Sequence, residues 1–490
     1  MQSNVSIKKN FIMNAILSMS AFIFPLITYP YVSRILGPEG TGKVSLAVSW
    51  TTYFNMFAQM GIPTYGIRAC AKVRDDKDEL TRTTHELFFI NLILGAIAYF
   101  GFFVLIISYP KIRSEKLLYI IVSSTILFNA IGMEWLFKGL EYYSYITKRS
   151  IIFKTIAVAA MFFLIQDHND YVWYGILSIF AASASNVLNF FYARKFIRMK
   201  PLGGYHFRRH FKAVGIFFAM SCATTVYTNL DTVMLGHMKT DADVGLYNAA
   251  VRIKAILVSI ITSLGSVLLP RASYYVENGN MQEFRRITRK AVHFVLLVSV
   301  PLALYFFIFA PYGIFLLAGS QYAGSVSPMR IIMPTLIFIG LTNIMGIQVL
   351  VPTGREIAVL YSEIAGAVVD AALNIVLIPR YAAAGAAIGT MTAEIVVFAV
   401  QYFVLRKEIR NVFREFHYGS LIIAIVASIA SSIWICKVDF SEMHFQAGNL
   451  IVLLVSSICF FGVYFFVLLR FKESIPVEIK EMVVRRICKK

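Results

Sequence analysis

Charged side chains are scarce in this chain of 490 residues. Asp, Glu, Lys and Arg make up 15% of it, hydrophobic residues make up 58%, and the mean hydropathy is +0.68. Soluble domains are roughly one quarter charged and about half apolar. The polar stretches between the apolar runs are also short, which leaves no room for a soluble catalytic domain.

Signatures of cofactor or metal chemistry are missing as well. The five cysteines form no CxxC pair and show no metal-ligand spacing, and we find no nucleophile–base arrangement. The segment Gly37 to Lys43 fits the phosphate-loop pattern GxxxxGK, but Val44 stands where Ser or Thr should bind Mg²⁺, and an apolar run precedes it instead of a strand. We therefore predict no resident cofactor, no metal and no enzymatic activity.

What the chain does contain is a series of apolar runs, each long enough to cross a hydrocarbon layer about 30 Å thick. We predict an all-α integral membrane protein of about fourteen transmembrane helices. The predicted spans are 11–35, 43–69, 84–109, 116–137, 146–166, 171–194, 212–237, 244–269, 289–317, 325–351, 356–378, 382–405, 418–436 and 446–471.

The formal net charge of +19 is concentrated in the gaps between alternate apolar runs. Segments such as 194–212 and 406–414 are dense in Lys and Arg, whereas the intervening gaps hold few. This pattern follows the positive-inside rule and predicts a multi-pass protein with both termini in the cytoplasm. It also favours the bilayer surface over nucleic acid as the partner of the basic residues.

Two stretches about six spans apart resemble each other. Ser33–Gly37 followed by Gly42 corresponds to Thr232–Gly236 followed by Gly245. Six spans per unit predicts two pseudo-symmetric six-helix lobes in the same orientation, plus two C-terminal helices. The predicted divisions are 1–197 (first lobe), 198–211 (basic cytoplasmic linker), 212–407 (second lobe), 408–472 (last two helices) and 473–490 (basic cytoplasmic tail).

Ionisable residues within the spans are the candidate functional residues, because charge in hydrocarbon is costly and should face a protein interior or a wet cavity. They are Arg68, Glu134, Lys138, Lys154, Asp231, Arg252, Lys254, Arg330, Glu363, Asp370 and Glu394, with Arg34 at the edge of the first span.

Each candidate also has a structural interpretation. Glu134 and Lys138 are four residues apart and could form a neutralising intrahelical ion pair. Glu363 and Asp370 share one helix face, which serves a polar seam between helices as well as a transport path. Arg68 could simply anchor the inner end of its span.

Short motifs along most of the chain resemble those of the bacterial oligosaccharide flippases, a family in the superfamily that also holds multidrug extruders and the lipid II flippase. The motifs are Pro25–Tyr31, Arg34–Gly42, Glu134–Gly139, Asp231–Gly236, Val244–Ala250, Leu268–Arg271, Gln348–Gly354 and Leu377–Ala387. Relatives often have Gln where Lys138 stands here.

This resemblance implies a flippase in the bacterial plasma membrane. It would move a polyprenyl-diphosphate-linked oligosaccharide to the outer leaflet by alternating access, for O-antigen, capsule or exopolysaccharide assembly. A polysaccharide polymerase and glycosyltransferases would be its partners, and H⁺ or Na⁺ its coupling ion. The candidate diphosphate or sugar ligands are Arg34, Arg68, Arg252, Lys254 and Lys138, and the coupling-ion candidates are Asp231, Glu363, Asp370 and Glu394.

Three other functions compete with this one. A cation-coupled multidrug extruder has the same fold and predicts a cavity lined by unpaired carboxylates. A membrane enzyme acting on the same lipid usually has a large external loop, and here the external gaps are short. A scaffold protein without transport activity would have no need for the costly charged residues within the spans.

Overall fold

The computed structural model describes residues 7–438, 445–473, 475–477 and 481. These residues form α-helices with short π- and 3-10 segments, and no strand occurs among them, which confirms the predicted all-α class. Most of the predicted basic tail 473–490 lies outside the described residues.

The chain divides into two compact units, Met1–Gly245 and Leu246–Lys490. Elements of the first unit are α1 (Ile7–Gln59), α2 (Ile62–Lys72), α3 (Lys77–Ser108), α4 (Pro110–Ser114), α5 (Lys116–Gly132), α6 (Glu134–Gly139), α7 (Tyr143–Leu164), α8 (Tyr171–Ile179), η1 (Phe180–Ala184), α9 (Asn186–Ala193) and α10 (Arg208–Met238). Helix α11 (Asp241–Glu277) continues from the first unit into the second.

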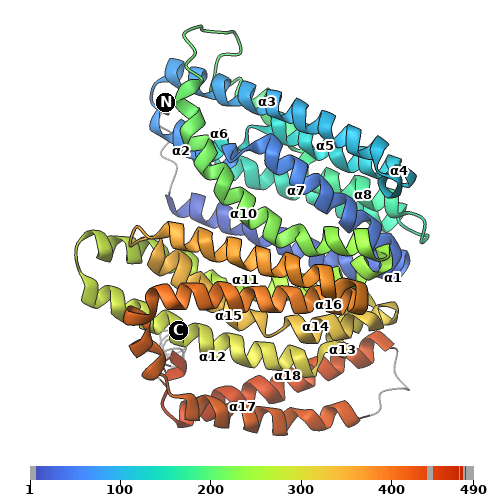
Figure 1. The fold of residues 1–490 in the computed structure, drawn as a ribbon, viewed down its shortest axis with the longest axis vertical. Coiled ribbons are helices and arrows are strands. Elements are labelled where there is room, and N and C mark those ends of the chain that lie inside the picture. Colours follow the sequence, from blue (N-terminus) through green and yellow to red (C-terminus); the bar gives the residue numbers. More distant parts are fainter. Residues whose placement is uncertain (1–6, 439–444, 474, 478–480, 482–490) are drawn as a thin grey trace, which may run out of the picture. The chain divides into compact units, whose positions relative to one another are not determined.

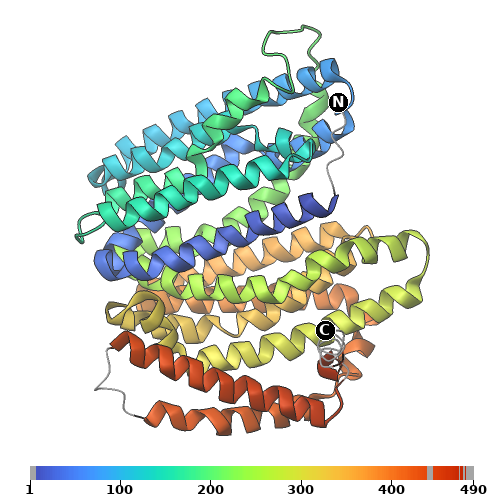
Figure 2. The ribbon, with the colours of Figure 1, turned by 180° about the vertical axis from the view of Figure 1, so that it is seen from behind.

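The second unit contains the remaining elements, which are α12 (Met281–Ile308), α13 (Ala310–Ala318), η2 (Ser320–Ser325), α14 (Val326–Ile332), α15 (Thr335–Thr342), η3 (Asn343–Leu350), α16 (Glu356–Arg414), α17 (Tyr418–Ser432), η4 (Ile433–Lys437) and α18 (Phe445–Arg470). Helices α17 and α18 lie side by side in Figure 1 and in the reverse view of Figure 2.

The predicted second lobe begins at residue 212, whereas the boundary between the compact units lies after Gly245 in the sequence. The difference arises because α10 packs against α1 and α2 of the first unit. The two six-helix lobes therefore stay a prediction.

The two longest helices each contain one residue with non-helical backbone. Helix α1 has 53 residues and is broken at Gly37 (φ 66°), and α16 has 59 residues and is broken at Ala382 (φ 47°). A straight helix of either length would be about 80 Å or more, far beyond the hydrocarbon thickness. Each therefore supplies two successive segments, as the predicted turns near Gly37 and between 378 and 382 require.

By length and composition, eight described helices can cross a membrane, or up to ten if each bent pair is one span. All fourteen predicted ranges fall largely on helical residues. Counting the long helices α1 and α16 twice each raises this to at most twelve, so the number of fourteen stays a prediction.

Gly42 and Gly245, the two glycines singled out by the repeat, meet in the first unit. A Cβ on Gly42 would overlap the carbonyl oxygen of Asp241 and lie 2.9 Å from the amide nitrogen of Gly245. A Cβ on Gly245 would overlap the carbonyl oxygen of Pro38. The starts of two repeat-related helices thus touch backbone to backbone, which only glycine allows.

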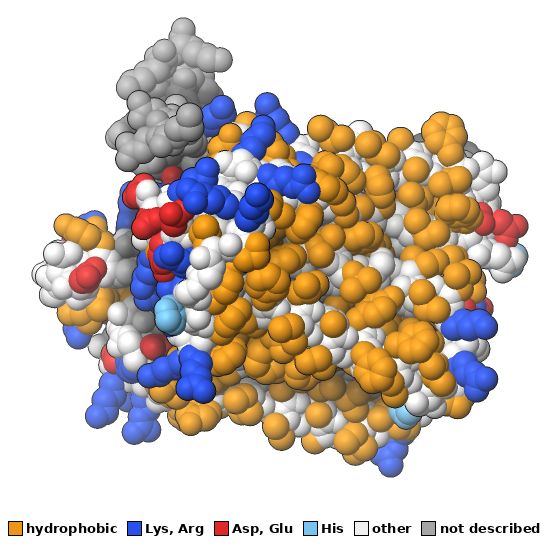
Figure 3. All heavy atoms as spheres, turned by 90° about the horizontal axis from the view of Figure 1, so that it is seen from above, with side chains coloured by type: hydrophobic (Ala, Val, Ile, Leu, Met, Phe, Trp, Pro, Cys, Tyr) orange, Lys and Arg blue, Asp and Glu red, His pale blue; other side chains and the backbone are white. Residues whose placement is uncertain are grey.

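Apolar side chains are widely exposed, as expected for a surface that faces lipid. On α3, Ile93, Ile97 and Phe100 are 61%, 64% and 68% exposed. Figure 3 shows a broad apolar field with Lys and Arg gathered at its margins. Such a field exceeds any patch expected on a soluble monomer and fits a multi-pass membrane protein.

The predicted orientation is testable by cysteine labelling. In a cysteine-free variant, Lys200→Cys should react with a membrane-impermeant maleimide only after the cells are permeabilised, because the 194–212 segment is predicted to be cytoplasmic. Asp167→Cys should react in intact cells. Both side chains are exposed. The opposite labelling pattern would overturn the predicted topology.

The glycine contact predicts a specific loss of stability. Gly42→Ala should lower the free energy of unfolding by about 1–3 kcal/mol, because the backbone of α1 must move away from Asp241. Gly215→Ala is the control: no atom lies within 4 Å of its added Cβ, so it should leave the melting temperature unchanged or raise it. Equal melting temperatures for wild type and Gly42→Ala in detergent would refute the contact.

Candidate functional site

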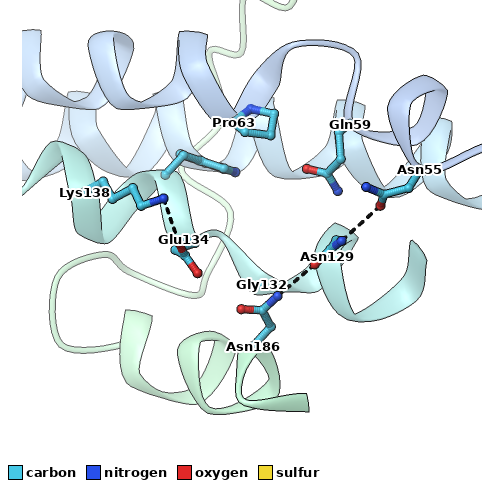
Figure 4. A pocket seen from close by; sticks show the side chains of 9 residues that line it. Asn55, Gln59, Pro63, Asn129, Gly132, Glu134, Lys138 and Asn186 are labelled. Atoms are coloured by element: carbon cyan, nitrogen blue, oxygen red, sulfur yellow. Dashed lines mark hydrogen bonds and ion pairs between the residues drawn. The ribbon is translucent and has the colours of Figure 1, made fainter. Parts of the chain in front are cut away.

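A polar pocket of about 200 Å³ lies inside the first unit (Figure 4). It is lined by Asn55, Gln59, Pro63, Asn129, Gly132, Glu134, Trp135, Lys138 and Asn186. These residues come from α1, α2, α5, α6 and α9, so five elements separated in sequence converge on one cavity.

Interruptions in three of the helical segments surround the pocket. Met60 and Gly61 separate α1 from α2 with φ of 42° and 74°, and Met133 separates α5 from α6 with φ of 40°. The π-helical turn η1 ends just before Asn186. Broken helices within a bilayer occur where the backbone is buried in protein or lines a cavity. Left-handed methionines also cost about 1–3 kcal/mol each and often mark functional positions.

Asparagine side chains stabilise the break at Met133. Asn189 donates a hydrogen bond to the carbonyl of Gly132 at 2.7 Å, and Asn91 donates one to the carbonyl of Ala130 at 3.3 Å. These bonds replace the helical donors that the break removes. Gly132 also lacks the Cβ that would lie 2.7 Å from Cγ of Asn186, so Asn186 can approach the pocket.

Three carboxamides form a chain along one side of the pocket. Nδ2 of Asn186 donates to Oδ1 of Asn129 at 3.0 Å, and Nδ2 of Asn129 donates to Oδ1 of Asn55 at 3.1 Å. The chain therefore ends in a donor group at Asn55 and an acceptor at Asn186.

A carboxylate with two cations forms the opposite side. Glu134 pairs with Lys138 at 2.8 Å and with Arg149 at 3.2 Å. The side chain of Arg149 is only 4% exposed and also donates to the carbonyl of Ser185 at 3.2 Å. The intrahelical pair of Glu134 and Lys138 is present as predicted, and the additional cation gives the group a formal charge of +1.

Two donors in the pocket have no hydrogen-bond partner, namely Nε2 of Gln59 and Nε1 of Trp135. Gln59 is 9% exposed and Trp135 is 3% exposed. A buried donor without a partner costs roughly 1–3 kcal/mol. Both residues line the pocket, so a ligand there is the nearest candidate partner for these donors.

The other sequence-predicted residues of the first unit lie apart from this pocket's lining. Arg34 donates to the carbonyl of Pro30 within α1, and Arg68 is exposed on α2. Asp231 is buried on α10 (5% exposed). Lys138 and Glu134 are thus the only two of the sequence-derived candidates that line the described cavity.

In the second unit, Arg252 and Lys254 are half-buried on α11, and Glu363 is half-buried on α16. Asp370 is 1% exposed, accepts a hydrogen bond from Asn374 at 3.2 Å, and would lie 2.7 Å from a Cβ on Gly389. The two parts of α16 therefore pack along the predicted polar face.

Farther along the same seam, Gln401 donates to Ser362 at 3.0 Å, and Glu394 is 6% exposed. The structural seam is thereby observed. A role of these carboxylates in ion coupling stays a prediction. Among the described residues, no group of three or more His, Cys, Asp or Glu side chains is placed to hold a metal ion.

A second charged cluster ties the predicted linker to the first unit. The fully buried carboxylate of Glu86 on α3 pairs with Arg209 at 2.8 Å and with His210 at 2.7 Å, and His210 also contacts Tyr65 at 2.8 Å. In the preceding loop, Asp76 accepts hydrogen bonds from two backbone N–H groups at the start of α3, which lowers the pKa of its carboxyl.

The sequence did not single out several of these residues. Asn55, Gln59, Asn129 and Asn186 are neutral, whereas the candidates derived from the sequence are all ionisable. Arg149 was not among the candidate residues within the spans, but it is buried beside Glu134. Amides within apolar runs were the signal that could have found the pocket, because they too need partners in hydrocarbon.

Comparison with known proteins identifies the family. A family model described as polysaccharide biosynthesis protein matches residues 7–276, which is more than half of the chain. The chain belongs to the polysaccharide biosynthesis protein family. A second model, MatE, matches residues 217–376 of this family member.

Individual relatives agree with this family. The chain is 23% identical over 407 residues to a putative O-antigen transporter of Escherichia coli (strain K12), covering 83% of this chain and 98% of that protein. Its fold is similar to that of the lipid II flippase MurJ in an inward closed conformation, with a TM-score of 0.67, 16% identity, and coverage of 92% of this chain and 99% of the other.

An inward-facing multidrug transporter of the MATE family is also similar, with a TM-score of 0.64 and 13% identity over 83% of this chain and 99% of that one. The resemblance to the oligosaccharide flippases is thus confirmed. This member of the polysaccharide biosynthesis family is a multi-pass membrane protein of the flippase type.

The buried cluster around Glu86 predicts a large stability effect. Glu86→Ala should lower the free energy of unfolding by about 3–5 kcal/mol, because it leaves Arg209 and the buried ring of His210 without their shared carboxylate. Glu415→Ala is a matched control that removes the exposed Glu415–Arg289 pair at 2.6 Å, and it should cost at most about 1 kcal/mol. Equal losses in thermal unfolding would contradict the structural role of Glu86.

Proposed function

We propose that this protein moves a polyprenyl-diphosphate-linked oligosaccharide from the cytoplasmic to the outer leaflet of the bacterial plasma membrane, for O-antigen, capsule or exopolysaccharide assembly. The observation that carries the proposal is the family match over residues 7–276, together with the likeness to O-antigen transporters. The substrate would be made by glycosyltransferases on the inner face and used by a polymerase on the outer face.

A helical membrane protein with polar residues in its interior can lower the cost of moving a charged lipid head through the bilayer. A diphosphate-sugar head carries charge and many hydroxyls, and its passage through about 30 Å of hydrocarbon is very costly. Polar and basic residues within an apolar helical body can replace the water around the head. The polyprenyl tail can remain in lipid beside the exposed apolar helices throughout the movement.

Basic residues within the spans would hold the diphosphate. Arg34, Arg68, Arg252, Lys254 and Lys138 remain the candidates, because phosphate oxygens are good acceptors for guanidinium and ammonium donors. Coupling to H⁺ or Na⁺ would use Asp231, Glu363, Asp370 or Glu394. Three of these four carboxylates are at least nine-tenths buried, where proton or sodium binding changes the local energy strongly.

Drug extrusion is the second candidate, and the MatE match over residues 217–376 favours it. A site for cationic drugs requires exposed negative charge. In the pocket of the first unit, the only carboxylate is already paired with Lys138 and Arg149. The resulting positive charge supports an anionic or neutral polar substrate over a cation.

Deletion of the gene should abolish the surface polysaccharide, and a plasmid copy should restore it. The double variant Arg252→Ala/Lys254→Ala should fail to restore it, because two cations are lost from the proposed diphosphate path. The control Arg406→Ala/Lys407→Ala removes two exposed cations near the end of α16 and should restore the polymer fully.

The measurement is the amount of surface polysaccharide per cell, with membrane levels of each variant checked by immunoblot. Full restoration by Arg252→Ala/Lys254→Ala would remove these residues from the site. A deletion strain with normal polysaccharide and a raised sensitivity to cationic drugs would replace the proposed function with the second candidate.

A further inference from the structure

Several hydrogen-bond donors line the pocket of the first unit. Nε2 of Gln59 and Nε1 of Trp135 are buried without partners, and the carboxamide chain ends in the Nδ2 group of Asn55. In Figure 4 the side chain of Gln59 points from α1 toward the space between Glu134 and Asn129. An indole N–H and amide N–H groups can donate but cannot accept, so their ligand must offer oxygen acceptors.

The charge of the pocket also favours a ligand with oxygen acceptors. The carboxylate of Glu134 is shared by Lys138 and Arg149, and the half-exposed ammonium of Lys138 keeps donors that Glu134 does not use. Acceptors in the ligand therefore meet both neutral donors and a net positive field. A cationic ligand would meet repulsion and unfilled donors.

The size of the pocket limits the ligand. A volume of about 200 Å³ holds roughly six or seven water molecules at the density of the liquid. This space can hold one sugar ring and is too small to enclose a complete oligosaccharide. The exposed ring of Pro63 supplies apolar surface for the C–H face of such a ring.

The indole ring of Trp135 is held in place by helix α2. A Cβ on Gly66 of α2 would lie 2.8 Å from Cδ2 of Trp135, so the ring packs directly against the α2 backbone. The left-handed residues Met60 and Met133 flank Gln59 and Glu134 and fix the directions in which these side chains leave the helices. A preformed site loses little conformational entropy when a ligand binds.

We infer that this pocket recognises one sugar ring of the translocated oligosaccharide, and that the selected ring carries a carbonyl or carboxylate substituent, as in an acetamido sugar or a uronic acid. The inference rests on the proposed function, and it adds a specificity site that shares only Lys138 with the diphosphate candidates. Gln59, Trp135 and Asn55 would donate to the substituent, while Asn186 would accept from a ring hydroxyl.

The inference is testable by sugar binding to the full-length protein in nanodiscs. Saturation-transfer NMR would measure the dissociation constants of N-acetylglucosamine, glucuronate and glucose. We expect one of the first two to bind about tenfold more tightly than glucose, because glucose leaves the donors of Gln59 and Trp135 without a strong acceptor. The tighter of the two identifies the substituent. Equal binding of all three sugars, or binding of none, would overturn the inference.

Two variants remove one donor each and keep a large apolar side chain in its place. Trp135→Phe and Gln59→Leu should each weaken binding of the preferred sugar about tenfold. Trp173→Phe is the matched control, since Trp173 is 44% exposed on α8 and does not line the pocket, and it should bind like wild type. Wild-type affinity in both pocket variants would also overturn the inference.

Two further measurements distinguish a loss of folding from a loss of sugar binding, and a failure of this inference from a failure of the proposed function. Thermal unfolding of each variant shows whether the site is intact, and Gln59→Leu serves if Trp135→Phe is unstable. In the deletion strain, the pocket variants should reduce polysaccharide about tenfold. If they restore it fully while Arg252→Ala/Lys254→Ala does not, the sugar site is wrong and the proposed function stands. If deletion has no effect on polysaccharide, the proposed function is wrong whatever the sugar affinities are.

Discussion

The structure depends on one constraint: inside hydrocarbon, every backbone N–H and C=O group needs a partner from the protein. Continuous helices meet this requirement by themselves, and most of the described chain consists of them. Wherever a helix is interrupted, other groups must take over. At Met133, the side chains of Asn91 and Asn189 do so by binding the carbonyls of Ala130 and Gly132.

The interruptions also border the polar pocket of the first unit. A regular helix presents side chains and hides its backbone, so closely packed regular helices leave little polar space. The breaks at Met60, Gly61 and Met133 separate the ends of adjoining helices, and the side chains beside them then converge. Strained backbone and polar lining thus have a common cause, because both arise where the helices are interrupted.

Much of this arrangement could be predicted from the sequence. Apolar runs gave the helical ranges because the hydrocarbon thickness fixes their length. The Gly42 and Gly245 correspondence predicted a repeat, and the contact between these glycines was not part of that prediction. The pair of Glu134 and Lys138 followed from a spacing of four residues. The short motifs led to the correct family.

The remaining features depend on tertiary contacts that no local pattern encodes. Arg149 lies on α7, and only the packing of α7 against α6 brings it to Glu134. The pocket unites residues from position 55 to position 186, and neutral amides give no periodic signal. The hydrogen bonds of Glu86 with residues more than 100 positions away were equally inaccessible to local reasoning.

The proposed function is the movement of an anionic lipid-linked oligosaccharide across the bilayer. Proteoliposomes that contain a fluorescent polyprenyl-diphosphate oligosaccharide test it most directly, with a membrane-impermeant reagent that quenches only the outer leaflet. Without protein, about half of the fluorescence should stay protected, because unaided crossing is slow. With the protein, and an imposed H⁺ or Na⁺ gradient where needed, the protected fraction should fall toward zero. A protected fraction that stays the same with active, folded protein under both gradients would contradict the account.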